Sequence, residues 1–158
     1  GTCSFIQMQR GNLPSKINNL RIGEALLLGV DTSFNLTIDC LRQDTMELEA
    51  ELVEVRSKPT LPIGEIGRDA FGNVPVFEDR GNRLRGILGI GKQDVNINGL
   101  TPLDEGVKII TASSDHLLVD IEDCPLRPQV GDILRFRPDY GAMLSSSTSP
   151  YVTKKFEG

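Results

Sequence analysis

A short polar stretch carries side chains that could take part in proton transfer or binding. Residues 111–121 read TASSDHLLVDI and contain His116, the only histidine of the chain, directly after Asp115. An imidazole titrates close to neutral pH, and polar groups at the start of a strand can be held rigidly against something outside the protein. By spacing alone, the stretch is more typical of a polar turn that leads into a strand.

Other motifs for catalysis are weak. Residues 86–92, GILGIGK, fit the first part of a phosphate-binding P-loop, but Gln93 stands where a Ser or Thr should bind magnesium. A β-like stretch follows where the P-loop needs the start of a helix, so these glycines are more typical of a bent or closely packed strand. With one histidine and no HExxH or GxSxG motif, neither a hydrolase triad nor a metal site is expected.

The composition is that of an ordinary soluble globular protein with about one domain. The chain has 158 residues, 39% of them hydrophobic, and a net charge of -5, which gives no general basic field for binding nucleic acid. No apolar run approaches the roughly 18 residues of a membrane span. The charge and the short apolar runs therefore predict neither nucleic-acid nor membrane partners. Cys3, Cys40 and Cys124 are odd in number and far apart, so we expect reduced thiols in a cytoplasmic protein.

The strongest structural pattern begins at Thr45. Met46, Leu48, Ala50 and Leu52 alternate with glutamates, which predicts a strand with one face in solvent, and the change of phase after Leu52 predicts a bulge or bend. Short strands separated by turns then indicate a mainly β domain, either a small barrel or a sandwich. These further strands are predicted at residues 84–90, 93–97, 107–112, 117–121 and 132–137.

Residues 1–30 have a different character. Their apolar run Ala25–Leu28 has no polar side, so we expect it to be buried all round, as a short helix or a strand. The rest of residues 1–30 offers few partners for such a run, as though the segment were the end of a larger structure.

Several segments together resemble the C-terminal half of pyridoxal-phosphate-dependent amino-acid racemases of the alanine racemase type, and especially their ornithine racemase branch. The resemblance covers nearly the whole chain and is specific in its longest segments. The segments are RIGEALLLG at 21–29, GEIGRDAFGNVPVFEDR at 64–80, GIGKQDVNINGLTP at 89–102, SSDHLLVD at 113–120 and DYGAMLSSSTSPYV at 139–152.

This resemblance implies a domain organisation. Residues 1–30 would be the end of an N-terminal α/β barrel, and residues 31–158 would be a C-terminal β domain that completes the site of the partner subunit in a head-to-tail homodimer. The lysine that binds the cofactor would lie outside this sequence, so the chain alone should be inactive. The parent would interconvert the L and D forms of an amino acid such as ornithine or alanine.

The resemblance also assigns residues to the cofactor. Ser4, in GTCS, and the backbone at Gly23 and Glu24 would bind the phosphate of pyridoxal phosphate, as would Tyr151 near the chain end. Arg21 would face the pyridine nitrogen, where a fixed positive charge limits how far the ring withdraws electrons and so holds the chemistry to racemisation.

The second acid–base group is the main departure from the family. Racemisation needs a proton donor on each face of the substrate carbon, and alanine racemases place a tyrosine after an Ile-Gly pair, whereas Lys92 follows Ile90-Gly91 here. Lys92, Asp115 and His116 are the candidates, Lys92 by its position and His116 because imidazole titrates near neutral pH. Ser114 and Asp115 would also belong to the loop that meets the substrate carboxylate from the opposite subunit.

An alternative interpretation stays open. The chain would then be a stand-alone β-barrel module that binds a ligand or a partner protein. The long irregular stretch 58–83 and the serine-rich end around residues 145–147 would provide its binding surface.

Overall fold

The computed structural model describes the chain except for residues 35, 65–66, 69–71, 73–75, 77 and 157–158. The chain divides into two compact units, Gly1–Glu47 and Leu48–Gly158. The predicted boundary between residues 30 and 31 lies inside the first unit, and the assignment of residues 1–30 to the end of an α/β barrel stays a prediction. None of the helices in the described part of the chain has the length and apolar character needed to cross a lipid bilayer.

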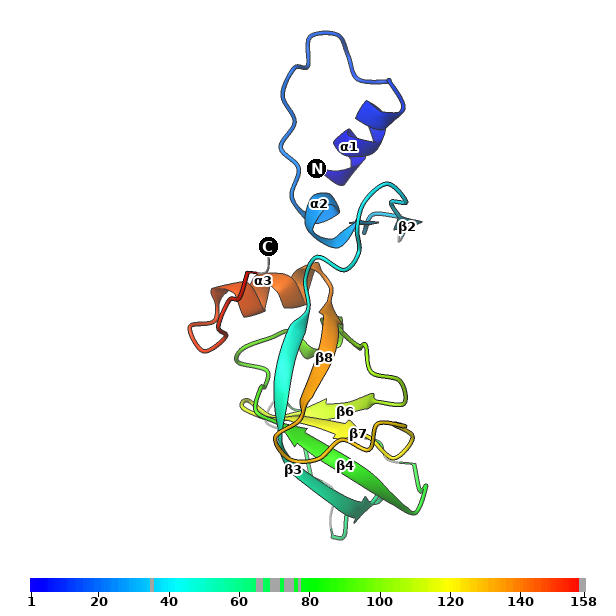
Figure 1. Cartoon of the computed structure of the whole chain (residues 1–158), viewed down its shortest axis with the longest axis vertical. Coiled ribbons are helices and arrows are strands. Elements are labelled where there is room, and N and C mark those ends of the chain that lie inside the picture. Colours follow the sequence, from blue (N-terminus) through cyan, green and yellow to red (C-terminus); the bar gives the residue numbers. More distant parts are fainter. Residues whose placement is uncertain (35, 65–66, 69–71, 73–75, 77, 157–158) are drawn as a thin grey trace. The chain divides into compact units, whose positions relative to one another are not determined.

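The first unit is a small structure of helices and one short β pair. Helix α1 places Phe5, and helix α2 places Ala25, in a small apolar cluster with Ile38. A cluster of this size buries little apolar surface and therefore contributes little stability by itself. The elements are α1 (Thr2–Gln9), α2 (Glu24–Leu28), β1 (Val30–Asp31) and β2 (Leu36–Thr37), coloured in shades of blue to cyan in Figure 1.

Helix α2 corrects the expectation for the apolar run Ala25–Leu28. The two ends of the run are buried, but Leu26 and Leu27 keep 49% and 44% of their surface exposed, so the prediction of burial all round is wrong. A helix of about one turn that lies on one small cluster can bury only one side. The helix ends at Gly29, whose φ of 66° is left-handed and whose added Cβ would lie 2.4 Å from the Arg42 carbonyl oxygen.

The second unit is mainly β, as predicted. It forms one six-stranded antiparallel sheet in the order β5-β8-β3-β4-β7-β6, which curls into a nearly closed barrel (Figure 1). Helix α3 packs against the short 3-10 turn η1 and against β8. The elements are β3 (Leu48–Pro59), β4 (Asn82–Leu88), η1 (Ile97–Gly99), β5 (Leu100–Pro102), β6 (Lys108–Ala112), β7 (Leu117–Asp120), β8 (Ile133–Pro138) and α3 (Tyr140–Thr148).

Strand β3 follows the predicted alternation. Leu48, Ala50 and Leu52 are buried, while the glutamates between them are exposed. The strand pairs with β8 up to Glu51 and with β4 from Leu52 onward, and its register with β4 shifts between Leu52 and Glu54. The shift confirms the predicted bulge, which lets one bent strand belong to both halves of the sheet.

Four of the further predicted strands are confirmed as β4, β6, β7 and β8, with small shifts at their ends. The strand predicted at residues 93–97 is wrong. The Gly91 carbonyl oxygen accepts hydrogen bonds from the Asp94 N–H at 3.0 Å and the Val95 N–H at 3.1 Å, so the chain turns here and then enters η1. Val95 and Ile97 are buried because this turn packs onto the core, and their alternation does not mark a strand.

One hydrophobic core lies inside the curled sheet. Gly86 lies within β4, where an added Cβ would be 2.4 Å from Leu52 Cδ2 and 3.2 Å from Val119 Cγ2. A glycine at this position lets side chains of β3 and β7 meet over β4. The buried core residues are Leu48, Ala50, Leu52, Leu88, Ile90, Val95, Ile97, Leu100, Val107, Ala112, Leu117, Val119, Ile121, Cys124, Leu134, Phe136 and Ala142.

The serine-rich residues 145–147, which the alternative interpretation assigns to a binding surface, lie in helix α3. Ser145 and Ser146 donate hydrogen bonds to the Gly141 and Ala142 carbonyl oxygens of the same helix, both within 2.9 Å. Their hydroxyls are therefore engaged within the protein. Several residues of the stretch 58–83 lie outside the described part of the chain.

Candidate functional site

The candidate site of the second unit lies where two loops meet. The Lys92 N–H donates to the Ser113 carbonyl oxygen at 2.9 Å, and the Gln93 N–H donates to the Ser114 carbonyl oxygen at 3.0 Å. These bonds join the turn after β4 to the turn between β6 and β7. The structure thus brings Lys92 next to residues 114–116, from which it is well separated in sequence.

Gly91 makes this contact possible. An added Cβ at Gly91 would lie 2.1 Å from the Ser114 carbonyl oxygen and 2.4 Å from the Asp115 nitrogen, which is closer than a side-chain carbon can approach. A glycine here lets the two backbones touch, and it thereby sets how near Lys92 can come to Asp115.

The polar stretch around His116 is both a turn and a set of exposed polar groups. The Ser113 hydroxyl accepts from the His116 N–H at 3.0 Å, and the Ser113 N–H donates to the His116 carbonyl oxygen at 2.9 Å. The Asp115 carboxylate accepts from the Gln93 side-chain amide at 2.8 Å and from the Ser114 hydroxyl at 2.6 Å. Ser114, Asp115 and His116 are all exposed. A turn structure and a binding role are therefore compatible.

Lys92 is half-buried and lines an open pocket of about 360 Å³. The pocket combines apolar side chains with amide, hydroxyl and ammonium groups, a mixture that suits a small polar ligand. A primary amine at its edge could exchange a proton with a molecule held there. The other lining residues are Val95, Asn96, Ile97, Asn98 and Ser145.

Helix α3 fixes the loop that carries Lys92. Asp139 caps the helix, because its carboxylate accepts from the Ala142 N–H at 2.7 Å, and its own N–H donates to the Gly99 carbonyl oxygen at 2.7 Å. Further along the helix, the Ser145 hydroxyl accepts from the Asn96 N–H at 2.9 Å. The loop after β4 is therefore attached to α3 at more than one point.

Tyr151 lies beyond α3 and keeps 78% of its surface exposed. Its N–H donates to the Ser149 hydroxyl at 3.2 Å, and the Lys154 ammonium donates to the Ser149 carbonyl oxygen at 2.6 Å. The phenol is thus exposed to solvent, and its role in binding the cofactor phosphate stays a prediction.

The predicted cofactor residues of the first unit lie on neighbouring segments. Ser4 is in the first turn of α1, Gly23 is the N-terminal cap of α2, and Glu24 is the first residue of α2. The Gly1 nitrogen donates to the Arg21 carbonyl oxygen at 3.2 Å. This bond joins the start of α1 to the segment that leads into α2.

These groups have the chemistry that a phosphate needs. The Leu26 N–H donates to the Gly23 carbonyl oxygen at 3.0 Å, but the helix offers no acceptor to the Glu24 and Ala25 amides, and the Ser4 hydroxyl is a further donor in the same unit. An added Cβ at Gly23 would meet nothing within 4 Å, so a ligand can approach the backbone there. Arg21 is exposed, and the Glu24 carboxylate accepts a hydrogen bond from the Thr32 hydroxyl. The donor set therefore fits the phosphate of pyridoxal phosphate.

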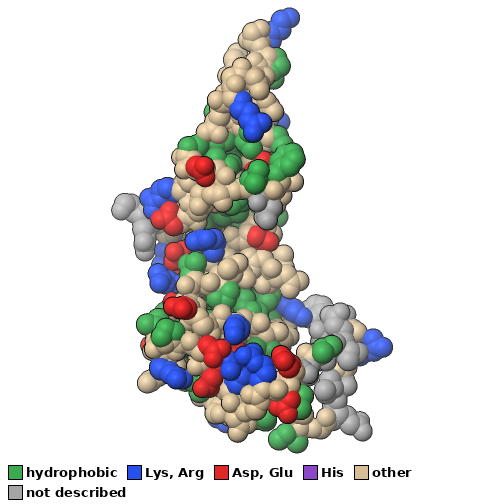
Figure 2. Space-filling model, turned by 90° about the vertical axis from the view of Figure 1, so that its right-hand side faces the viewer, with side chains coloured by type: hydrophobic (Ala, Val, Ile, Leu, Met, Phe, Trp, Pro, Cys, Tyr) green, Lys and Arg blue, Asp and Glu red, His purple; other side chains and the backbone are tan. Residues whose placement is uncertain are grey.

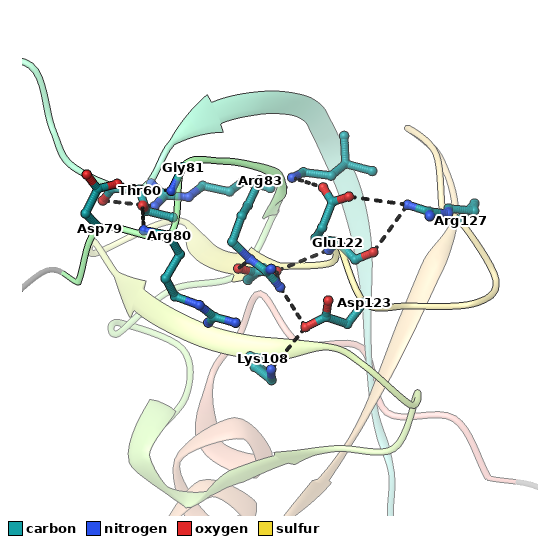
Figure 3. Close-up of polar contacts among 12 residues, drawn as sticks. Thr60, Asp79, Arg80, Gly81, Arg83, Lys108, Glu122, Asp123 and Arg127 are labelled. Atoms are coloured by element: carbon teal, nitrogen blue, oxygen red, sulfur yellow. Dashed lines mark hydrogen bonds and ion pairs between the residues drawn. The ribbon is translucent and has the colours of Figure 1, made fainter.

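Figure 3 shows a network of ion pairs around Arg83. The network lies where β4 begins and β7 ends, whereas Gly91 follows the other end of β4. Arg83 binds both Asp120 carboxylate oxygens, at 2.5 and 3.0 Å, and binds Asp123 at 2.6 Å. Lys108 also donates to Asp123, at 3.1 Å. The Arg83 and Asp120 side chains keep only 11% and 7% of their surface exposed. These charges satisfy one another and hold the sheet together.

The network lowers the pKa of two carboxyl groups. Burial would raise the pKa of Asp120, but hydrogen bonds from Arg83 and from the Glu122 N–H outweigh it and hold this pKa below its ordinary value of 3.8. Hydrogen bonds from Arg83 and Lys108 lower the pKa of Asp123 in the same direction.

We expect the second unit to lose stability in acid. A carboxyl whose pKa is lower in the folded state stabilises the fold above its unfolded pKa, and this contribution is lost as the pH falls through the folded pKa. The free energy of unfolding should decline below about pH 4, and less steeply in Asp123→Asn. Urea titrations at about pH 7, 5 and 3, followed by circular dichroism, measure both slopes. Equal slopes would contradict the assignment.

Charges of opposite sign lie next to one another on the face of the molecule in Figure 2. This face therefore carries no extended field of one sign. In the described part of the chain, no group of three or more His, Cys, Asp or Glu side chains is arranged to hold a metal ion. Cys3 and Cys40 are free and exposed, and Cys124 is free and buried.

Sequence reasoning missed the residues that hold the candidate site in place. Gln93 reaches Asp115, and Asp94 accepts a hydrogen bond from the Ser149 hydroxyl at 2.8 Å. A charged residue directly before the apolar Val95 was one available signal. Nothing in the sequence pairs Asp94 with Ser149, because the two are far apart along the chain.

The chain is similar to part of each of two known racemases. No protein-family model matches the chain. It is 49% identical to an ornithine racemase of Acetoanaerobium sticklandii over 152 residues, which are 96% of this chain and 43% of the relative. It is 45% identical to a lysine racemase of Thermotoga maritima over 156 residues, 99% of this chain and 44% of the relative. The chain therefore spans less than half the length of either protein.

Solved alanine racemases share the fold. The biosynthetic alanine racemase of Pseudomonas aeruginosa superimposes with a TM-score of 0.58 at 18% identity, over 84% of this chain and 41% of its own. The alanine racemase of Oenococcus oeni gives a TM-score of 0.54 at 20% identity, over 90% of this chain and 41% of its own. The resemblance seen in the sequence is confirmed: the chain is a homologue of part of the ornithine and lysine racemases, and it shares its fold with part of the alanine racemases.

Proposed function

We propose that the chain is the C-terminal portion of a pyridoxal-phosphate-dependent racemase that acts on a basic amino acid, with ornithine as the first candidate. The likeness to an ornithine racemase across 96% of the chain is the main support. Because the chain spans 43% of that relative, an N-terminal α/β barrel of the parent would supply the rest, including the lysine that binds the cofactor. The chain alone would be inactive.

We also propose a head-to-tail homodimer in the cytoplasm. In this arrangement the second unit completes the site of the partner subunit. The exposed positions of Ser114, Asp115 and His116 support this role, because groups that serve a neighbouring subunit must lie on the surface. The free thiols suit a reducing compartment.

The cofactor would be held from this chain by the donors described above. Bound pyridoxal phosphate supplies an electron-withdrawing ring that stabilises negative charge on the substrate Cα. The Ser4 hydroxyl and the Gly23 and Glu24 amides would bind its phosphate, with the Tyr151 hydroxyl as a further donor. The Arg21 guanidinium would face the ring nitrogen as a fixed positive charge and a hydrogen-bond donor, without giving that nitrogen a proton.

Lys92 would be the second acid–base group. It lies in the loop that contacts Ser114, and it lines the pocket of about 360 Å³, so its amine could exchange a proton with a substrate whose carboxylate meets residues 114–115. Asp115 accepts hydrogen bonds from Gln93 and Ser114, which suits positioning better than proton transfer. His116 is the alternative base.

The parent protein tests this function. Purified with pyridoxal phosphate, it should show the absorbance of bound cofactor and convert L-ornithine to D-ornithine, followed by L-lysine and more slowly by L-alanine. Chiral chromatography measures each conversion. Residues 1–158 alone serve as the control and should convert none of them. A parent that binds the cofactor but racemises none of the three amino acids would overturn the proposal.

A further inference from the structure

Ser149 connects two segments of the candidate site. Its hydroxyl donates to the Asp94 carboxylate at 2.8 Å and accepts from the Tyr151 N–H at 3.2 Å. Asp94 and Ser149 keep only 6% and 7% of their surface exposed. A buried hydrogen bond to a carboxylate is stronger than an exposed one, and it is costly to leave unmade. We call this contact the Asp94–Ser149 link.

The Asp94 end of the link belongs to the turn that carries Lys92. The Asp94 N–H donates to the Gly91 carbonyl oxygen at 3.0 Å, and the Val95 N–H donates to the same oxygen at 3.1 Å. Lys92 lies inside this turn. A shift of the Asp94 side chain would therefore move the backbone that sets where the Lys92 amine can reach.

The Ser149 end belongs to the segment that carries Tyr151. The Ser149 carbonyl oxygen also accepts from the Lys154 ammonium at 2.6 Å, and Lys154 donates to the Val152 carbonyl oxygen at 2.7 Å as well. The backbone around Tyr151 is thus folded around Ser149. Ser149 therefore helps to fix the backbone of Tyr151, together with Val152, which packs against the core.

Ser146 shows that burial alone does not produce such a link. It lies within α3, of which Ser149 is the C-cap, and it is also buried, at 9% exposure, but its hydroxyl donates to the Ala142 carbonyl oxygen of its own helix at 2.8 Å. Its hydrogen bonds are local to α3, whereas those of Ser149 join separate parts of the chain.

We propose that Asp94 and Ser149 are positioning residues that hold the Lys92 turn and the Tyr151 segment in one fixed arrangement. The inference rests on the proposed function, in which Lys92 exchanges a proton with the substrate and Tyr151 binds the cofactor phosphate. Loss of the link should then impair both groups together, although the Asp94 and Ser149 side chains are buried and bonded to each other.

The test compares Ser149→Ala with Ser146→Ala in the parent racemase. Ser149→Ala should weaken cofactor affinity and lower kcat, each about tenfold, with little change in KM for the amino acid, because the two groups are displaced but not removed. Ser146→Ala should change neither. Tyr151→Phe should weaken cofactor affinity alone. Asp94→Ala should match Ser149→Ala, Asp94→Asn should recover most of the loss, and the double alanine variant should be no worse than either single one.

Hydrogen exchange in residues 1–158 separates this inference from the proposed function. Ser149→Ala should speed exchange at the Asp94 and Val95 amides, and Ser146→Ala should not. If Ser149→Ala speeds exchange but the wild-type parent is inactive, the Asp94–Ser149 link is supported and the proposed racemase function is not. An active parent in which Ser149→Ala matches Ser146→Ala in kcat, in cofactor affinity and in exchange would overturn the link.

Discussion

Lys92→Ala in the parent racemase is expected to lower the rate of racemisation by about 100-fold to 10,000-fold, the contribution typical of a positioned acid–base group. Lys92 lies at the edge of a pocket beside the loop of Ser114. If it is the second acid–base group, as proposed, its removal would take away proton transfer on one face of the substrate carbon. The cofactor lysine on the other face would remain. The variant should still exchange the Cα proton of one enantiomer with deuterium from the solvent, without inverting it.

Proton nuclear magnetic resonance in deuterium oxide separates exchange from inversion. Lys92→Arg keeps a positive charge but cannot give up its proton, so it should be as inactive as Lys92→Ala if the amine transfers a proton. Lys155→Ala is the matched control, because Lys155 is exposed and pairs with the exposed Glu49 at 3.3 Å. It should keep full activity.

Asp115→Ala and His116→Ala complete the panel. Asp115→Ala should raise KM more than it lowers kcat, because it loosens the contact with Gln93 that joins the two loops. If only His116→Ala loses activity, the imidazole is the second acid–base group. Full activity in all three alanine variants would show that the second group lies outside these residues.

The sheet could be predicted where one face of a strand is in solvent. Leu48, Ala50 and Leu52 alternate with glutamates because one side of β3 packs on the core and the other is wet, so the pattern and the burial agree. The bulge after Leu52 was visible for the same reason. At Val95 and Ile97 the same alternation was misleading, because a turn can also bury every second residue when it lies on a core.

The apolar run in α2 shows a different limit. Ala25 is buried against Phe5 and Ile38, but Leu26 and Leu27 are exposed in this chain. A run of leucines indicates that apolar surface is present, but it does not predict which element covers that surface. The sequence therefore identified a segment in need of partners without showing how much of it this unit would bury.

The candidate site was predictable in its members but not in its assembly. Residue types and the family resemblance pointed to Lys92, Ser114, Asp115 and His116. Their proximity depends on Gly91, which allows a backbone contact that no side chain would permit. A glycine in a sequence does not say which distant carbonyl group it approaches, so this contact required the fold.

Arg83→Met is expected to destabilise the second unit more than the loss of an exposed arginine would, because it leaves the largely buried Asp120 carboxylate without its partner. Arg83 and Asp120 are both largely buried, and the Asp120 carboxylate accepts two hydrogen bonds from the guanidinium. Without Arg83 the carboxylate must either stay charged in a poorly solvated position or take up a proton. Urea unfolding followed by circular dichroism measures the change, since the chain has no tryptophan to report it by fluorescence.

Arg127→Met is the matched control. Arg127 pairs with Glu122 at 3.8 Å, and its side chain is 65% exposed, so its loss should cost no more than about 1 kcal/mol. The double variant Arg83→Met with Asp120→Leu should recover part of the lost stability, because it removes the stranded charge as well as its partner. If Arg83→Met and Arg127→Met cost the same, the Arg83 network is a surface feature and its burial has no energetic consequence. If the double variant is less stable than Arg83→Met alone, the damage comes from lost packing around the guanidinium stem and not from an unpaired carboxylate.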